Sequence, residues 1–226
     1  MPPVNQFLNH RIECNTVFTG HPMVYQCEWP LYQSHHGINP NYTAIKYSIR
    51  SNKLEIGDKK LFHNIRDHCN LWRNNYDVQD NWNSVSSIID FYGDNKDGFL
   101  EVAGPGSWND PDMLVIGNFG LSLEQSRAQM SLWVMFAAPL IMSNNLRTIR
   151  PEFVEILQHR EILKIARDPR GIPGKRVRRL KHVDFFVRPV SPVLGAKLSQ
   201  VVAIYNRWQE GGTPLKVTVN LTKNYL

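Results

Sequence analysis

The sequence has 226 residues, of which 42% are hydrophobic and 20% are charged, a balance that is typical of a globular protein and excludes a disordered chain. No apolar run approaches the roughly 20 residues that span a bilayer, and residues 1–15 lack the apolar segment of a secretory signal. The net charge of +6 arises partly in 174–183, where Lys and Arg residues cluster without interleaved aromatic side chains. We therefore expect no membrane span, no signal peptide in this chain and no nucleic-acid partner, and we expect the basic run to be a solvated face.

Cysteine and histidine spacing indicates no metal site and no other cofactor. Cys14, Cys27 and Cys69 form no C-x-x-C pair, and the eight His residues show no metal-binding spacing. Asn41 and Asn220 begin N-x-[ST] triplets and are candidate glycosylation sites. Together with a disulfide among the cysteines, these triplets would favour a protein of the secretory pathway.

Two short apolar runs near the start predict the first strands of a sheet. Residues 22–29 and 68–74 are each rich in apolar and aromatic side chains, and each ends in polar residues. The stretch 46–64 between them is charged and weakly patterned, although a crossover helix is expected there. We therefore interpret 46–64 as a poorly patterned insert.

A helix and a third strand are predicted next. Apolar residues in 80–93 recur with the helical period, so we predict a helix that Asp80 or Asn81 caps and that Gly93 ends. The run 98–106 contains apolar residues closed by Gly and Pro, and we predict a strand there.

The next segments continue the alternation of helices and strands. Ser122, with Gln125 three residues later, forms a capping box for a helix that ends before Pro139. Residues 139–145 are predicted to form a strand, and Pro151 lies in the first turn of another helix. Strands and helices that alternate in this way predict a parallel sheet covered by helices.

The pattern changes near residue 168, where a turn-rich segment begins. β-type runs at 184–190, 200–208 and 215–221 follow, separated by Pro and Gly. We predict a β/α domain at 1–168 and the start of an antiparallel β-domain at 169–226.

Acidic and aromatic residues follow each of the first three predicted strands. Parallel β/α sheets carry their sites at the carboxyl ends of the strands, so we expect these side chains to meet on one face. Carboxylates that accept hydrogen bonds from hydroxyl groups, with rings that stack on a pyranose, indicate a sugar site whose paired carboxyl groups act at the anomeric carbon. Each residue also has a structural interpretation: Trp29 and Trp72 as core side chains, Arg73 and Asp77 as a surface ion pair, and Asp110 as part of a turn.

Four motifs together resemble one family of enzymes. They are VYQCEWPLY, CNLWRNNYD, AGPGSWNDPDMLVIGNFGLSLEQSRAQMSLW and AAPLIMSNNLRTI, and residues 19–168 are similar to the lysosomal α-galactosidase and α-N-acetylgalactosaminidase group of glycoside hydrolase family 27. The resemblance implies an α/β fold, namely a partial (β/α)8 TIM barrel, about strands 5–8, followed by an incomplete antiparallel β-domain. It also implies a retaining glycosidase that uses two aspartates.

The acid/base of the family lies in an R-N-x-x-D motif, which here runs from Arg73 to Asp77. The resemblance implies that Asp77 protonates the departing glycosidic oxygen and later deprotonates the attacking water. It implies that Arg73 and Asp112 bind sugar hydroxyl groups. The remaining substrate-binding residues that it implies are Glu28, Trp29, Leu31, Tyr32 and Met113.

The resemblance also covers features outside the sugar pocket. It implies a disulfide between Cys27 and Cys69 that fixes two active-site loops, leaves Cys14 unpaired, and matches Asn41 to a glycosylation position. It further implies a lysosomal or secreted location and a homodimer, which is frequent in the family.

Two pocket residues distinguish the substrates of the group. The galactosidases carry Glu and Leu in the first loop, where the N-acetylgalactosaminidases carry smaller Ser and Ala that leave room for an acetamido group. This chain has Glu28 and Leu31, which favour α-galactoside-bearing glycans or glycolipids as partners. The segment LSLEQSRAQM resembles the other enzyme more closely, so α-N-acetylgalactosaminidase stays the first alternative.

The family nucleophile lies in a K-x-D motif, and this triplet occurs nowhere in the sequence. A retaining glycosidase needs both carboxyl groups, about 5–5.5 Å apart. We therefore expect the chain to be inactive by itself, as a fragmentary or imperfect gene product. A non-catalytic sugar-binding or interaction module is the second alternative.

Overall fold

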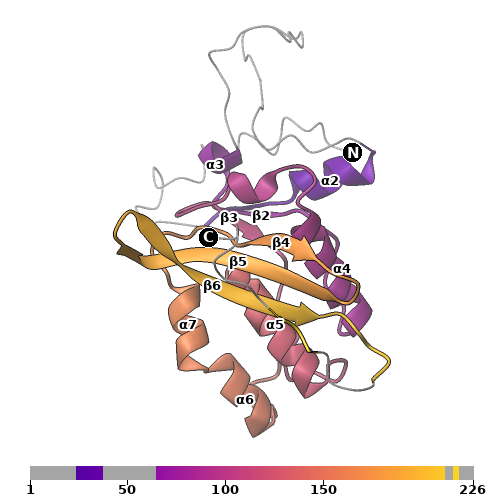
Figure 1. The fold of residues 1–226 in the computed structure, drawn as a ribbon. Coiled ribbons are helices and arrows are strands. Elements are labelled where there is room, and N and C mark those ends of the chain that lie inside the picture. Colours follow the sequence, from indigo (N-terminus) through magenta and orange to yellow (C-terminus); the bar gives the residue numbers. More distant parts are fainter. Residues whose placement is uncertain (1–23, 38–64, 212–215, 219–226) are drawn as a thin grey trace, which may run out of the picture.

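The computed structural model describes residues 24–37, 65–211 and 216–218, which form two three-stranded sheets with helices packed against them (Figure 1). The first sheet is parallel and the second is antiparallel. Four predicted features lie outside the described residues: the insert at 46–64, the unpaired Cys14 and the glycosylation sites at Asn41 and Asn220.

The parallel sheet brings distant parts of the sequence together. Its strands are β1 (Gln26–Cys27), β2 (Leu71–Arg73) and β3 (Trp108–Asp110), in that order. The register places Arg73 beside Asp110. Polar residues that follow different strands therefore meet at one edge of the sheet.

The strands predicted at 22–29 and 68–74 are confirmed in a shorter form, because a helix takes up one side of each run. Helix α2 (Trp29–His35) follows β1 directly, and helix α3 (Ile65–His68) precedes β2. The aromatic and polar end of the first run therefore belongs to a helix and not to a strand.

The strand predicted at 98–106 is wrong, because a 3-10 helix at Phe99–Glu101 occupies its centre. Gly98 precedes this turn with a φ of 67°, a conformation that glycine adopts without strain. The Asn95 side chain accepts a hydrogen bond from the backbone N–H of Leu100 at 3.1 Å. The apolar side chains of this segment thus reach the core from a helical turn, and the third strand is β3, a few residues later.

Helix α4 (Trp82–Asp94) confirms the prediction except at its end. The Asn81 side chain accepts a backbone N–H of the first turn at 2.9 Å, so Asn81 and not Asp80 is the cap. The helix continues past Gly93 and stops at Asn95, which has the left-handed conformation that Asn tolerates at a helix end.

Helix α5 (Leu123–Met135) begins with the predicted capping box. The Ser122 hydroxyl accepts the Gln125 N–H at 3.2 Å, and the Gln125 side chain accepts the Ser122 N–H at 2.9 Å. The strand predicted at 139–145 is reduced to one parallel bridge, at Met142.

Two short helices follow and pack against α5. Helix α6 (Pro151–Leu157) has Pro151 at its first position, as predicted. Helix α7 (Arg160–Ala166) was not predicted, because seven residues are too few to show a clear period.

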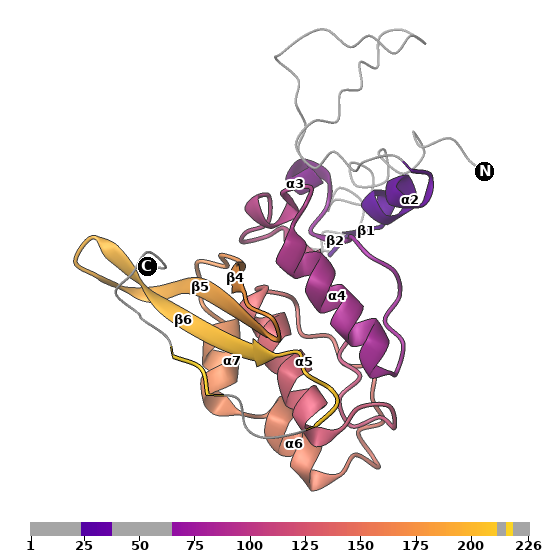
Figure 2. The ribbon, with the colours of Figure 1, turned by 45° about the vertical axis from the view of Figure 1, so that its right-hand side comes forward.

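The antiparallel sheet consists of β4 (Lys175–Arg179), β5 (Val183–Leu194) and β6 (Lys197–Asn206). In both ribbon views β6 runs across α5 (Figure 2). Phe136, just after α5, packs edge-to-face against Phe186 of β5, with ring centroids 5.8 Å apart. The two sheets therefore share one hydrophobic core.

The second sheet confirms two of its three predicted strands. The runs 184–190 and 200–208 fall largely in β5 and β6. The third strand is β4, whereas the described part of 215–221, residues 216–218, lies outside any strand. Strand β4 was not predicted because its residues are mainly basic and lack an apolar alternation.

The basic run 174–183 is only partly the solvated face that we predicted. Arg176 forms ion pairs with Asp90 and Asp94 of α4 and with Asp184 of β5. Arg179 contacts Asp90 and Asp184, the latter at 2.7 Å. These cations therefore join the antiparallel sheet to a helix of the parallel part, and we call these five residues the acid–arginine cluster.

Candidate active site

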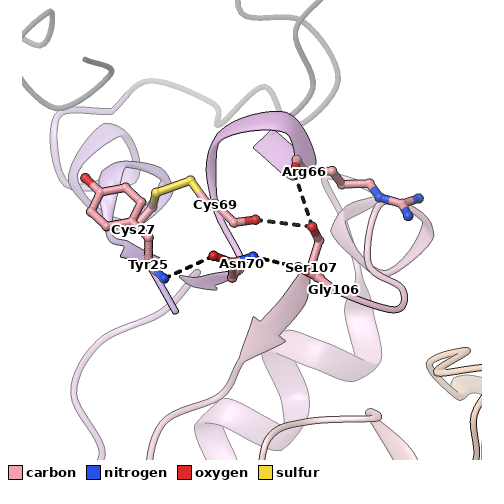
Figure 3. Close-up of a disulfide and its surroundings, with 7 residues drawn as sticks. All are labelled: Tyr25, Cys27, Arg66, Cys69, Asn70, Gly106 and Ser107. Atoms are coloured by element: carbon pink, nitrogen blue, oxygen red, sulfur yellow. Dashed lines mark hydrogen bonds between the residues drawn. A yellow bond between two sulfur atoms is a disulfide. The ribbon is translucent and has the colours of Figure 1, made fainter. Parts of the chain in front are cut away.

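A disulfide ties together the segments that carry the first two loops. Cys27 ends β1 and Cys69 precedes β2; their sulfur atoms are bonded, as predicted, and their Cα atoms are 5.9 Å apart (Figure 3). The Asn70 side chain accepts the Tyr25 N–H and donates to the Gly106 carbonyl, each at 3.1 Å. These bonds fix β1, β2 and the approach to β3 relative to one another.

Arg73 lies at the centre of the polar edge. Its side chain is 8% exposed, and its Nη2 lies 3.0 Å from Oδ1 of Asp77 and 2.9 Å from Oδ2 of Asp112. The Asp77 side chain is 79% exposed and the Asp112 side chain is 7% exposed. One buried guanidinium thus holds a solvent-facing and a buried carboxylate, so Arg73 and Asp77 are more than a surface ion pair.

Asp112 occupies a tightly bonded turn. Its φ is 79°, which is uncommon for a residue with a side chain. Its Oδ2 accepts the Val78 N–H at 2.7 Å, and its Oδ1 accepts the Met113 N–H at 2.8 Å. Its carbonyl accepts the Trp133 indole N–H at 2.7 Å. The surrounding bonds therefore hold the carboxylate in one orientation, toward Arg73.

Asp110 lies beneath this turn and is 3% exposed. Its Oδ1 accepts the Asp112 N–H, and its Oδ2 accepts the side-chain amide of Gln26, both at 2.8 Å. Burial raises the pKa of Asp110 to about 6, although these hydrogen bonds and the charge of Arg73 act in the opposite direction. Asp110 therefore shapes the turn and does not face the solvent.

Helix α2 presents the remaining predicted side chains. The Tyr32 hydroxyl donates to the Glu28 carboxylate at 3.2 Å. The negative charge of Glu28 is the main cause that raises the pKa of Tyr32, and Asp77 adds to it. Leu31 is 8% exposed and belongs to the core. Trp29 is the first residue of α2, and its side chain lies outside the described part of the structure.

Three polar residues of the site were missed by the prediction. The Gln26 amide donates a hydrogen bond to Asp110, and the Trp133 indole donates one to the carbonyl of Asp112. Asn109 accepts the Trp72 indole N–H at 2.6 Å and an Asn74 amide N–H at 2.8 Å. Gln26 and Asn109 directly precede Cys27 and Asp110, and this adjacency was the only local signal. Trp72 is fully buried, which confirms its alternative interpretation as a core side chain.

The arrangement separates two chemical roles. Asp77 is accessible to a ligand and to water, so its carboxyl group is placed to exchange a proton. Arg73 and Asp112 are fixed and nearly buried, so they are suited to orienting hydroxyl groups. Met113, which follows Asp112 in the chain, is 39% exposed. Within the described residues, no group of three His, Cys, Asp or Glu side chains is placed to hold a metal ion.

The chain was compared with known families and proteins. Residues 54–168, about half of the chain, match the family model described as alpha galactosidase A. The chain belongs to glycoside hydrolase family 27. Of the relatives of this family 27 chain, the α-N-acetylgalactosaminidase of Gallus gallus is 43% identical over 206 residues, which cover 91% of this chain and 44% of that protein. The α-galactosidase A of Homo sapiens is 43% identical over 201 residues, which cover 89% of this chain and 41% of that protein.

Solved structures show that the family 27 chain has an α/β fold with a β-domain. The α-galactosidase I of Mortierella vinacea matches with a TM-score of 0.66 and 22% identity, over 89% of this chain and 47% of that chain. The family 27 chain spans about two fifths of the length of the curated relatives that it matches. Among its described helices, none is both long and apolar enough to cross a membrane.

Proposed function

We propose that this chain carries the acid/base and part of the sugar-binding side chains of a retaining α-galactosidase, which removes terminal α-galactosyl residues from glycolipids, glycoproteins or oligosaccharides. The observation that carries the proposal is the Arg73 guanidinium, which joins exposed Asp77 to buried Asp112 at neighbouring strand ends. Asp77 protonates the departing oxygen and later takes a proton from water. Arg73 and Asp112 bind the hydroxyl groups of the galactose.

The choice of an α-galactoside rests on Glu28. The α-N-acetylgalactosaminidases are 43–47% identical to the chain and α-galactosidase A is 43% identical, a difference too small to decide between the two substrates. Glu28 is exposed and accepts the Tyr32 hydroxyl, which holds its side chain beside the site. A glutamate in this position leaves less room for an acetamido group than a serine does. Leu31 is buried, so Glu28 carries the discrimination.

The same proposal extends to the architecture. The parallel sheet and the bridge at Met142 correspond to about strands 5–8 of a (β/α)8 barrel, residues 1–168 belong to the catalytic domain, and residues 169–226 begin the β-domain. The disulfide supports a lysosomal or secreted location, where thiols are oxidised. The homodimer stays a prediction.

A binding and turnover experiment tests the proposal. The sequence contains no K-x-D triplet, so we propose that these 226 residues bind α-galactosides without hydrolysing them when expressed by themselves. We expect saturation-transfer NMR to detect methyl α-galactoside, and Asp112→Ala to abolish this signal while Asp77→Asn keeps it. We expect no nitrophenol from 4-nitrophenyl α-galactoside. Nitrophenol release that Asp77→Asn removes would show that a second carboxylate is present.

Two matched ligands distinguish the proposed α-galactosidase from the α-N-acetylgalactosaminidase alternative. We expect methyl α-galactoside to give a stronger NMR signal than methyl N-acetyl-α-galactosaminide. Glu28→Ser should narrow this difference, because the shorter side chain makes room for the acetamido group. A wild-type preference for the acetamido sugar would favour the alternative.

Added azide separates the glycosidase from a non-catalytic module. Azide can attack the anomeric carbon in place of a carboxylate, forming a C–N bond as the glycosidic C–O bond breaks and Asp77 protonates the leaving oxygen. We expect azide-dependent formation of β-galactosyl azide from an α-galactoside, and its loss in Asp77→Asn. A binding module would retain galactosides and form no azide product.

A further inference from the structure

Two exposed rings lie beside the proposed acid/base. Tyr76 directly precedes Asp77 in the loop after β2 and is 60% exposed, and His35 is the exposed last residue of α2. The ring centroids are 4.6 Å apart and the ring planes are 79° apart, an edge-to-face pair. Neither ring belongs to the hydrophobic core, so the pair forms part of the surface around Asp77.

The pair is held on both sides. The Tyr76 N–H donates to the Asn75 side-chain oxygen at 2.9 Å, which fixes the backbone next to the ring. His35 lies on the helix that starts directly after β1, and the disulfide from Cys27 to Cys69 ties this strand to β2. Two segments far apart in the sequence therefore present their rings together before any ligand binds.

The position of the pair relative to Asp77 indicates which part of a substrate would meet it. Arg73 and Asp112 are nearly buried and are assigned to the galactose, whereas the Asp77 side chain is 79% exposed. An acid that protonates the glycosidic oxygen lies between the galactose and the leaving group. Tyr76 is exposed and adjoins Asp77 in the chain, so its ring is available to a group bound next to that acid.

We infer that Tyr76 and His35 form a platform for the leaving group and that this platform accepts a second sugar ring, whose apolar C–H face packs on the exposed aromatic surface. The inference rests on the proposed function, because the position of the leaving group follows from the role of Asp77. A pyranose suits this surface because the exposed rings offer apolar area in the loop that carries Asp77, whose carboxylate accepts hydrogen bonds from sugar hydroxyl groups.

Saturation-transfer NMR on the full 226-residue chain tests the platform with melibiose, in which glucose is the leaving group. We expect wild-type signals from both galactose and glucose protons. Tyr76→Ala should lower the glucose signals relative to the galactose signals by roughly threefold or more, because the stacking surface is lost. Tyr76→Phe, which keeps the ring, should retain the glucose signals, and His35→Ala should cause a smaller loss than Tyr76→Ala.

The antiparallel sheet offers a matched control. Trp208 and His182, which flank its strands β6 and β5, form a similar edge-to-face pair with centroids 4.2 Å apart and planes 69° apart. Trp208→Ala should leave both sets of signals unchanged. Unchanged glucose signals in Tyr76→Ala would overturn the platform and leave the proposed function standing. Equal loss of galactose and glucose signals in Tyr76→Ala, with an unchanged circular dichroism spectrum, would also overturn it. A wild-type chain that gives no galactose signal would overturn the proposed function and the platform with it.

Discussion

Three carboxylates lie near Arg73, and they differ in their exposure to solvent. Asp77 faces the solvent, Asp112 is buried in direct contact, and Asp110 is buried one step further away. The motifs around these residues are sufficient to predict that Asp77 and Asp112 belong to one site. They could not predict the burial of Asp110 against Gln26, because Gln26 comes from another strand.

Asp110 should make the stability of the protein depend on pH. Its pKa is raised from 3.8 to about 6 in the folded state, so the folded state binds the proton more readily than the unfolded state. Protonated Asp110 therefore adds to the free energy of unfolding, by at most about 3 kcal/mol. This stabilisation is fully present below about pH 4 and is lost as the pH rises through about 6. Asp110→Asn removes the titration and keeps an oxygen for the Asp112 N–H. Urea unfolding should show the variant gaining stability relative to wild type between pH 4 and pH 7, and a constant difference would contradict the assignment.

Among the elements, those with a strong local signal were predictable. Helix α4 has a clear apolar period and α5 has a capping box, and both are confirmed. Strand β3 is only Trp-Asn-Asp, and its two buried residues are polar. They are held by hydrogen bonds such as that from Trp72 to Asn109, which no local pattern reveals. The apolar run at 98–106 was misassigned because a short buried turn and a buried strand share the same composition.

The capping box of α5 can be tested at its first residue. Ser122→Ala removes the hydroxyl that accepts the Gln125 N–H, and we expect a loss of about 1 kcal/mol in the free energy of unfolding. Ser87→Ala is the matched control, because Ser87 is exposed in the middle of α4 and contacts only its own helix among the bonds described. Urea denaturation should show a smaller effect for Ser87→Ala. Equal effects would mean that the box does not stabilise α5.

At the scale of the whole molecule, the acid–arginine cluster joins the antiparallel sheet to helix α4. Asp184 is fully buried and is shared by Arg176, Arg179 and Arg207. Gly93 belongs to the same junction, because a Cβ there would lie 2.4 Å from an Arg176 nitrogen. The basic run looked like a solvated face in the sequence because two of its acidic partners, Asp90 and Asp94, lie on α4, far away along the chain.

Asp184→Asn should be one of the most destabilising conservative changes in the chain. It leaves three arginines around a neutral buried side chain, and breaking such a buried arrangement costs about 3–5 kcal/mol. Glu152→Gln is the control, because Glu152 pairs with Arg150 at the surface, where side chains are 42% and 65% exposed, and a loss below about 1 kcal/mol is expected. Thermal and urea unfolding measure both variants. Similar small losses would show that Asp184 does not stabilise the acid–arginine cluster.

The disulfide has a consequence for how the sequence between its ends can evolve. Cys27 and Cys69 are 42 positions apart in the chain, yet their Cα atoms are held 5.9 Å apart. The entropy of closing a loop grows only with the logarithm of its length, so doubling the intervening segment costs about 0.6 kcal/mol. With both ends pinned covalently, the spacing of Glu28 and Asp77 does not depend on how many residues lie between them. Insertions between the two cysteines can therefore accumulate without moving Asp77, the proposed acid/base.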